Sequence, residues 1–281
     1  GRNNYQFFAE EMNRVANERL SLEGRLRQAL ARQELSLHYQ PQITADETRV
    51  VGVEALLRWE TPTEGMIAPD RFIAIAEETG LIVPIGAWVL KEACRQLRAW
   101  LDAGVSPLRM AVNLSARQLR NADLLATVGE ALAESGIPPH LLELEITESA
   151  IMEKPEEAIK VLQALKQRGI ELAVDDFGTG YSSLAYLKLF PIDHLKIDRS
   201  FVCDIERDAD DAAIAISTIA LAHSLDLKVV AEGVETRDQL SLLQRNGCDE
   251  VQGFLFSRPL PAAAATAYLR RGREDRLRQL H

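Results

Sequence analysis

The sequence predicts an α/β fold of the TIM-like (β/α)8 barrel type, preceded by an N-terminal linker helix. Short β-branched or alternating apolar runs alternate with longer helical patterns over most of the chain. Glycine or proline stands at many of the joints between them. Polar side chains recur at the carboxyl ends of the runs, and in a barrel these ends meet at one mouth. A doubly wound open sheet shares this alternation, and periodicity alone does not separate the two folds.

The expected elements follow one another in a regular order. The expected strands are Leu35–Gln40, Val50–Trp59, Leu108–Leu114, Leu142–Thr147, Ile170–Asp175, His194–Ile197, Lys228–Ala231 and Glu250–Gln252. The expected helices are Pro69–Glu78, Ile85–Leu101, Asp123–Ser135, Pro155–Gln167, Asp210–Leu225 and Arg237–Asn246. Two helical segments separate the second strand from the third, and the later intervals each fit one strand–helix unit.

An apolar stripe marks the first stretch of the chain, with steps that alternate between four and three residues. Its positions are Phe8, Met12, Val15, Arg19, Leu22, Leu26 and Ala29. Such a stripe is typical either of a coiled-coil seam or of an amphipathic linker helix that lies on its own domain. Because the chain opens at Gly1, we expect it to be a fragment of a longer protein.

Composition and charge limit the possible functions. A hydrophobic fraction of 47% and a charged fraction of 26% suit a globular protein with a buried core. The net charge of −10 argues against a long nucleic acid as partner, because such binding relies on lysine and arginine. The three cysteines form no CxxC pair, and the five histidines show no zinc-ligand spacing. The longest apolar runs are too short to span a bilayer.

Oxygen-bearing side chains stand near the carboxyl ends of the expected strands. They are Glu54, Asn113, Glu145, Asp175, Asp176, Glu232 and Gln252, and Lys196 accompanies them. Carboxylates beside buried strands are costly unless a cation pairs with them, and one lysine does not balance five. We therefore expect bound cations, and all-oxygen donors favour Mg²⁺ or Mn²⁺. Adjacent Asp175 and Asp176 allow one carboxylate to bridge two ions, an arrangement suited to in-line displacement at phosphorus.

Each of these positions also has a structural explanation when it is taken singly. Asn113 and the pair Asp175-Asp176 suit helix caps or turns, and Lys196 suits a snorkelling surface lysine. Gly178 and Gly180 suggest a phosphate loop, but no Gly-Lys-Ser/Thr follows them. The repetition at successive strand ends favours one shared site.

At these residues the sequence resembles the EAL-domain phosphodiesterases, over roughly Glu34 to Arg270. The motifs that carry the resemblance are Tyr39-Gln40-Pro41, Glu54-Ala55-Leu56-Leu57-Arg58-Trp59, Asn113-Leu114-Ser115, Glu145-Ile146-Thr147-Glu148, Asp175-Asp176-Phe177-Gly178-Thr179-Gly180-Tyr181-Ser182-Ser183-Leu184, Lys196-Ile197-Asp198, Glu232-Gly233-Val234-Glu235 and Gln252-Gly253-Phe254. The segment from Gly1 to Phe7 resembles the end of a GGDEF domain. The resemblance implies a tandem GGDEF–EAL parent protein and a barrel with one antiparallel strand.

The resemblance also implies a reaction and a ligand set. The reaction is hydrolysis of cyclic di-GMP to linear 5′-pGpG by a water that two metal ions activate. The residues implied for one ion are Glu54, Asn113, Glu145 and Asp175, and those for the other ion are Asp175, Asp176 and Glu232. The residues implied in catalysis are Glu54, Asp175 and Lys196, with Lys196 orienting the nucleophile and offsetting developing charge.

Supporting roles are implied in the same way. The residues implied to contact the dinucleotide are Gln40, Leu57 and Arg58. Glu148 would steady the Asp176–Ser183 loop, which is tied to dimer contacts in the family, so we expect a homodimer. The residues implied to support the metal ligands are Asp198, Glu235 and Gln252.

The expected organisation has three segments. Residues 1–33 form the GGDEF remnant and linker helix, residues 34–271 the EAL phosphodiesterase domain, and residues 272–281 a C-terminal tail. The complete ligand set favours an active phosphodiesterase over a cyclic di-GMP receptor that signals through the linker helix. A Mg²⁺ enzyme with a lysine base that abstracts a proton next to a carboxylate leaves Asp176 and the Gly178–Ser183 loop unexplained. We expect the catalytic domain to lie in the cytoplasm. A membrane anchor elsewhere in the parent protein is compatible with this location.

Overall fold

The computed structural model describes residues 19–105, 108–180 and 184–279, without side-chain detail for residues 184 and 272–279. The chain divides into two compact units. The first consists of Gly1–Ser36 and Leu57–Gly86, and the second consists of Leu37–Leu56 and Ala87–His281. The expected site residues belong to the second unit, apart from Leu57 and Arg58.

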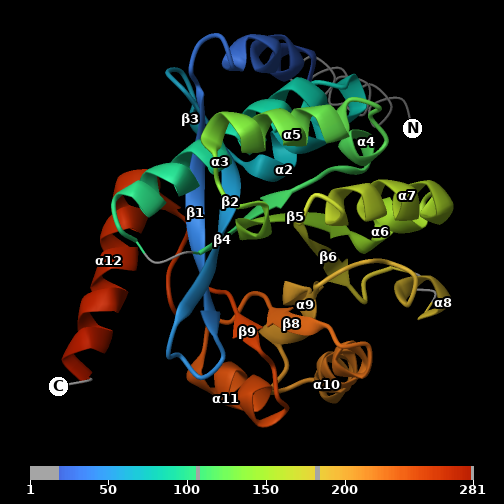
Figure 1. The fold of residues 1–281 in the computed structure, drawn as a ribbon, viewed down its shortest axis with the longest axis vertical. Helices are drawn as coiled ribbons and strands as arrows, with labels where there is room; N and C mark the ends of the chain where they lie inside the picture. Colours follow the sequence, from blue (N-terminus) through green and yellow to red (C-terminus); the bar gives the residue numbers. More distant parts are fainter. Residues whose placement is uncertain (1–18, 106–107, 181–183, 280–281) are drawn as a thin grey trace, which may run out of the picture. The chain divides into compact units, whose positions relative to one another are not determined.

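Eight strands close a barrel, which is drawn at the centre of Figure 1. They are β1 (Leu35–Thr44), β2 (Val50–Thr61), β4 (Arg109–Asn113), β5 (Leu142–Thr147), β6 (Glu171–Phe177), β7 (His194–Ile197), β8 (Lys228–Ala231) and β9 (Glu250–Val251). Their hydrogen-bonded order is β1-β9-β8-β7-β6-β5-β4-β2, and a further pairing of β1 with β2 closes the ring. This closure confirms the predicted (β/α)8 barrel and excludes the open sheet.

Strand β1 runs against the other seven strands of the barrel. Its residues Ile43 and Thr44 pair antiparallel with β9, whereas the pairings from β2 through β4 to β9 are parallel. The single antiparallel strand that the family resemblance implied is therefore confirmed. A short strand β10 (Leu260–Pro261) extends the sheet beyond β1. The carboxyl end of β1 consequently lies among the amino ends of its neighbours.

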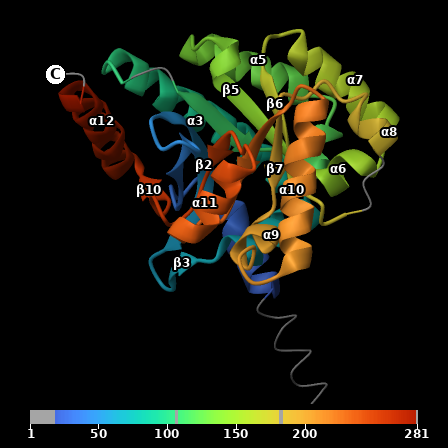
Figure 2. The same ribbon diagram turned by 90° about the horizontal axis from the view of Figure 1, so that it is seen from below.

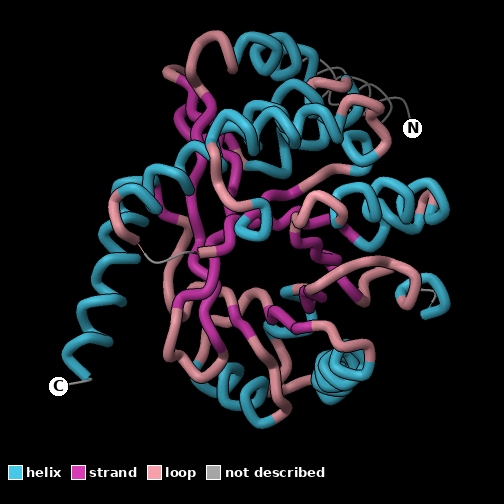
Figure 3. Tube along the Cα trace, viewed as in Figure 1, coloured by secondary structure: helices cyan, strands magenta, loops and turns pink. Residues whose placement is uncertain are grey.

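Helices of the second unit lie outside the strands in Figures 1 and 2, and Figure 3 shows how helix and strand alternate. The longer ones are α5 (Leu124–Ser135), α7 (Pro155–Lys166), α10 (Ala209–Ser224), α11 (Arg237–Arg245) and α12 (Ala262–Gln279). The shorter ones are α4 (Ala116–Leu119), the 3-10 turn η1 (Pro139–Leu141), α6 (Glu148–Met152), α8 (Leu184–Leu187) and α9 (Arg199–Cys203). Helix α3 (Ile82–Asp102) begins in the first unit and continues into the second. The predicted helices of these regions are confirmed to within a few residues.

Side-chain alternation separates the two faces of each barrel strand. In β4, Met110 and Val112 are buried apolar residues that alternate with Arg109, Ala111 and Asn113. Successive side chains of a strand point to opposite faces. Arg109 and Asn113 contact residues of other strands across the barrel interior, so Met110 and Val112 face the helical layer. The interior of the barrel is therefore polar at both ends of this strand.

The first unit packs around Trp59 of β2. The Trp59 ring meets the Phe72 ring of α2 (Pro69–Thr79) edge to face, with centroids 5.5 Å apart, and its Nε1 donates to Glu34 Oε2 at 3.0 Å. The guanidinium of Arg25 lies 5.9 Å from the Trp59 ring centroid and 2.8 Å from Glu64 Oε1. Strand β3 (Gly65–Ile67) pairs with β2 here. Aromatic and cation–π contacts therefore hold this unit together.

The described part of the N-terminal stripe is helical over residues 19–29. Leu22, Leu26 and Ala29 are buried, which favours a helix that lies on its own domain for this part of the stripe. The stripe positions Phe8, Met12 and Val15, and the GGDEF-like segment before them, lie outside the described residues. Within the described part of the chain, no single helix is long and apolar enough to cross a membrane, although α2 and α3, which are bent against each other, reach the threshold as a pair.

Gly253 provides a test of the packing just after β9. A Cβ atom at this position would lie 2.0 Å from the carbonyl oxygen of Val234, a backbone atom that cannot rotate away. We expect Gly253→Ala to lower the free energy of unfolding by about 3 kcal/mol, the upper end of the usual cost of overpacking.

Gly24 provides the matched control, because it is exposed in the helix of residues 19–29 and a Cβ there would meet nothing within 4 Å. We expect Gly24→Ala to raise the free energy of unfolding by about 0.5–1 kcal/mol. Urea unfolding of both variants measures the difference, and equal effects would contradict the close approach of Gly253 to Val234.

Candidate metal centre

Lys196, on β7, lies at the centre of the candidate site. Its Nζ is 2.8 Å from Glu145 Oε2, 3.2 Å from Asp175 Oδ2 and 2.6 Å from Glu232 Oε1. The Lys196 side chain is 1% exposed, so these carboxylates are its main source of stabilisation. The carboxylates come from β5, from β6 and from the residue after β8. The structure therefore brings four of the predicted site residues into direct contact.

Glu54, on β2, is held by two amides from its neighbours. Asn113 Nδ2 donates to Glu54 Oε1 at 2.6 Å, and Gln252 Nε2 donates to Glu54 Oε2 at 2.5 Å. The same Gln252 amide also lies 3.1 Å from Gln40 Oε1, and Gln40 Nε2 donates to the carbonyl of Ser257 at 3.1 Å. The barrel strands thus gather Glu54, Asn113, Gln40 and Gln252 into one hydrogen-bonded chain.

The pair Asp175-Asp176 occupies an irregular point of β6. In a regular strand the two side chains would point to opposite faces. The register between β6 and β7 shifts between Val174 and Phe177, and Asp176 has a left-handed φ of 53°. The backbone N–H of Asp176 donates to Asp175 Oδ1 at 2.9 Å. The bulge therefore changes the direction of Asp176 and fixes the carboxylate of Asp175.

The electrostatics of the cluster show an excess of negative charge. Burial, together with the charges of Glu54, Asp175 and Glu143, raises the pKa of Glu145 well above its usual range, although Lys196 opposes the shift. Burial, Asp175 and Glu54 likewise raise the pKa of Glu232 to about 8.

The pKa values of two further groups, Asp176 and Lys196, are shifted by the same cluster of carboxylates. Burial, Asp175 and Asp198 raise the pKa of Asp176 to about 6, and a hydrogen bond with Asp198 adds to the shift. Burial by itself lowers the pKa of Lys196, but the surrounding carboxylates outweigh burial and raise it well above its usual range. One lysine does not neutralise this set, so the site is short of positive charge.

The donor set fits hard divalent cations. Glu54, Asn113, Glu145, Asp175 and Glu232 offer only oxygen as ligand atoms, apart from the amide nitrogen of Asn113. Added positive charge at this point would relieve the unfavourable crowding of carboxylates that raises their pKa values. The donor set therefore fits the predicted metal centre in its chemistry, and three of its carboxylates, Glu145, Asp175 and Glu232, converge on Lys196.

Other predicted residues have different surroundings. Glu148 Oε2 accepts from the backbone N–H of Gly178 at 3.0 Å, which ties it to the glycine loop. Residues 181–183 of that loop lie outside the described residues. Asp198 Oδ1 accepts from the N–H of Ser200 and caps α9. Glu235 forms an exposed ion pair with Arg199 at 3.0 Å and shows no contact with the described carboxylates of the cluster.

Leu57 and Arg58 lie farther along β2 than Glu54, in the first compact unit. Arg58 Nη1 donates to the carbonyl of Leu57 at 2.8 Å. Their contacts with a dinucleotide stay a prediction.

A second polar layer lies in the same barrel, nearer the amino ends of the strands. Arg109 opens β4, and its Nε lies 3.0 Å from Glu143 Oε1. Its Nη2 lies 2.5 Å from Glu250 Oε2 and 3.0 Å from Gln42 Oε1, and its Nη1 lies 2.9 Å from His194 Nε2. Nη1 and Nη2 therefore have hydrogen-bond partners inside the barrel and Nε has an ion-pair partner, although Arg109 is almost fully buried.

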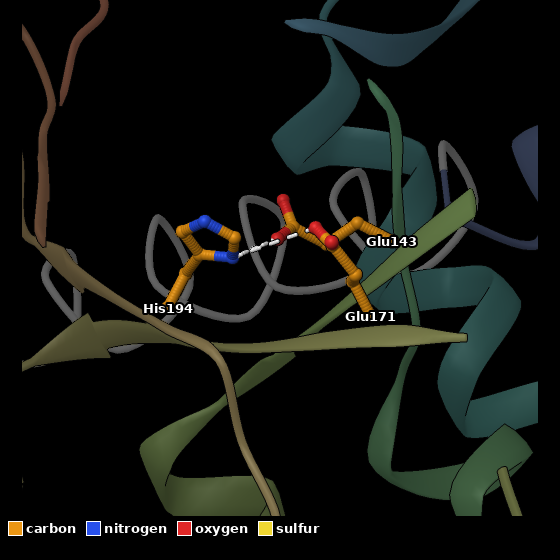
Figure 4. Close-up of side chains that lie close together, drawn as sticks. All are labelled: Glu143, Glu171 and His194. Atoms are coloured by element: carbon orange, nitrogen blue, oxygen red, sulfur yellow. Dashed lines mark ion pairs between the residues drawn. The ribbon is translucent and has the colours of Figure 1, made fainter. Parts of the chain in front are cut away.

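Glu143, Glu171 and His194 of this layer have ligand atoms within 4.8 Å of one another (Figure 4). Because the guanidinium of Arg109 only donates, Nε2 of His194 must accept, and Nδ1 then carries the proton toward Glu143 Oε2 at 2.5 Å. Arg109 thus supplies the positive charge that a metal ion would bring to this cluster. We assign these three residues to the Arg109 network and not to the metal centre.

Six residues in or beside this layer were not predicted from the sequence: Arg109, Glu143, Glu171, His194, Glu250 and Gln42. They precede the predicted site residues by two or four positions on the same strands, except on the reversed β1. Period-two alternation toward the amino end of each strand was the signal that would have found the five charged or imidazole side chains. It starts from Asn113, Glu145, Asp175, Lys196 or Gln252.

Comparison with known proteins gives the family. The EAL domain model matches residues 23–259. The bifunctional diguanylate cyclase/cyclic di-GMP phosphodiesterase MucR of Pseudomonas aeruginosa is 52% identical over 262 residues, which cover 93% of this chain and 38% of MucR. The cyclic di-GMP phosphodiesterase NbdA of the same organism is 50% identical over 275 residues, which cover 98% of this chain and 35% of NbdA. The chain thus spans little more than a third of the length of either relative.

A solved structure agrees with this match. The structure described as the phosphodiesterase PaMucR in complex with c-di-GMP is 51% identical and superimposes with a TM-score of 0.85. The superposition covers 87% of this chain and 99% of that one. The family model covers well over half of the chain. The chain therefore belongs to the EAL domain family.

Proposed function

We propose that the chain is a cyclic di-GMP phosphodiesterase, which hydrolyses the cyclic dinucleotide to linear 5′-pGpG with divalent metal ions. The observation that carries this proposal is the convergence of Glu145, Asp175 and Glu232 on the single buried cation of Lys196. The names of MucR and NbdA, and the c-di-GMP bound in the PaMucR structure, support the choice of substrate.

The metal chemistry follows from the ligands. EAL phosphodiesterases generally depend on divalent metal ions. Glu54, Asn113, Glu145 and Asp175 would hold one Mg²⁺ or Mn²⁺ ion, and Asp175, Asp176 and Glu232 would hold a second one. Such ions supply an activated water and neutralise charge that develops at phosphorus.

The protein side chains prepare the site. Asn113 and Gln252 orient Glu54 through the amide contacts to its two oxygens. Lys196 holds its charge beside Glu145, Asp175 and Glu232, where it offsets negative charge near the reacting phosphate. Gln40 lies next to Gln252 with its amide anchored on the Ser257 carbonyl, and we propose that it contacts the dinucleotide.

Catalysis is favoured over a receptor without turnover. No predicted metal-ligand position is replaced, and each of these side chains lies in the described part of the chain with its contacts formed. The homodimer remains a proposal, because both the linker stripe and the Asp176–Ser183 loop extend beyond the described residues. The bifunctional name of MucR supports a GGDEF domain upstream in the parent protein.

We expect Glu54→Gln to lower turnover of cyclic di-GMP by at least about 100-fold, because a neutral amide replaces a ligand carboxylate. The measurement is separation of the linear product after incubation with cyclic di-GMP and Mg²⁺ or Mn²⁺. Glu60→Gln is the matched control, because Glu60 lies on the same strand but is exposed. Binding of the dinucleotide by the unmodified chain without any linear product would contradict the proposed activity.

We expect Lys196→Met to lower the stability of the metal-free protein by about 3–5 kcal/mol, because it leaves buried carboxylates without a cation. Mn²⁺ should then raise the melting temperature of this variant more than that of the unmodified chain. Lys166→Met is the control, since Lys166 pairs with the half-buried Asp193 at 2.7 Å, away from the cluster. A Lys196→Met protein as stable as the unmodified chain would show that the carboxylates do not depend on this lysine.

A further inference from the structure

Gln42 lies between the two polar layers of the barrel and touches both. It is fully buried near the carboxyl end of the reversed strand β1. Its Oε1 accepts from Arg109 Nη2 at 3.0 Å, and its Nε2 donates to Glu145 Oε1 at 3.4 Å. Gln42 therefore connects a residue of the Arg109 network directly to a carboxylate of the candidate metal centre.

The direction of this amide is determined by its two neighbours. A flipped amide would place its NH₂ group against the guanidinium of Arg109, which has only donors. The flip would also place its oxygen against the carboxylate of Glu145, which accepts when it is ionised. Arg109 holds its own position through Glu143 and Glu250, so it cannot turn to accommodate the flip. Only one orientation of Gln42 satisfies both contacts.

Gly52 leaves the space that Gln42 occupies. A Cβ atom at position 52 would lie 2.6 Å from Gln42 Oε1 and 3.2 Å from the carbonyl oxygen of Arg109. Gly52 lies on β2, two residues before Glu54, and pairs with Arg109 in the register between β2 and β4. Any larger residue there would displace the amide or the strand. The absence of a side chain at position 52 is thus an independent observation that the amide has a defined place.

The consequence concerns both oxygens of Glu145. Lys196 Nζ lies 2.8 Å from Oε2, and Gln42 Nε2 lies 3.4 Å from Oε1. The ion pair with Lys196 and the hydrogen bond from Gln42 together restrict rotation of the carboxylate about its last torsion. The longer distance on the Gln42 side makes this the weaker of the two contacts. We infer that Gln42 is a positioning residue, which aligns the Glu145 carboxylate for a divalent cation by using Arg109 as its fixed support.

This inference rests on the proposed metal centre, and its test uses Mn²⁺ alone, without substrate. Isothermal titration calorimetry of the full chain measures the affinity for Mn²⁺. We expect Gln42→Leu to bind Mn²⁺ about 10-fold more weakly than the unmodified chain, at the low end of the effect expected for a residue that orients a ligand. We expect Gly52→Ala, which retains the Gln42 amide, also to weaken the binding of Mn²⁺. This variant provides the test if Gln42→Leu does not fold.

Gln239→Leu is the matched control. Gln239 is also a buried glutamine, and it donates to the carbonyl of Cys203 and caps α11 without touching the carboxylates around Lys196. Its affinity for Mn²⁺ should stay within twofold of the unmodified chain. A similar loss in Gln239→Leu would overturn the inference, because the effect would then reflect general loosening of the fold.

Kinetics provide a second readout that a purely structural role would not change. In cyclic di-GMP turnover, Gln42→Leu should raise the Mn²⁺ concentration for half-maximal rate about 10-fold and leave the KM for the dinucleotide unchanged. Unaltered Mn²⁺ affinity in both Gln42→Leu and Gly52→Ala overturns the positioning role while the proposed phosphodiesterase stands. Failure of the unmodified chain itself to bind Mn²⁺ overturns the metal centre and the positioning role together.

Discussion

The structure of the site depends on one buried positive charge. Lys196 is almost completely withdrawn from water, which is costly for an ammonium group unless anions surround it. Glu145, Asp175 and Glu232 meet this requirement, and each comes from a different point of the barrel wall. The three carboxylates depend on Lys196 in turn, because none of them would be tolerated so close to the others without a cation. The remaining deficit of positive charge makes the same place receptive to divalent ions.

Much of this site could be predicted from the sequence, because the relevant information is local. Glu54, Asn113, Glu145 and Asp175 each follow an apolar run, and the carboxyl ends of parallel strands meet in a barrel. The direction of β1 could not be obtained in this way, because an alternating pattern is the same when a strand is read in either direction. The resemblance to the EAL family supplied that direction. The bulge at Asp176 was equally invisible, since it depends on the register with β7 and on a left-handed backbone.

The Arg109 layer was missed for a different reason. A charged residue at the amino end of a strand is usually exposed, so Arg109, Glu143 and Glu250 look like surface residues in the sequence. Their burial follows from long-range pairing across the barrel, which one sequence does not reveal. Gln42 was harder still to predict. Because β1 is reversed, its residue in contact with Arg109 follows Gln40 in the chain, whereas on the other strands the residues of the Arg109 layer come first. The two polar layers are nevertheless related by simple alternation along β4, β5, β7 and β9 once the fold is known.

The reversed direction of β1 has a mechanical consequence. A strand that ran parallel to the others would enter the barrel at the end opposite the carboxylates, whereas β1 begins at the carboxylate end. Gln40 and Gln42 are two residues apart on this strand, one beside Gln252 and the other beside Glu145. A sliding of β1 along its axis would therefore shift both amides together, by the same distance. The polypeptide that leads into β1 is thus connected to Gln40 and Gln42 along one continuous strand.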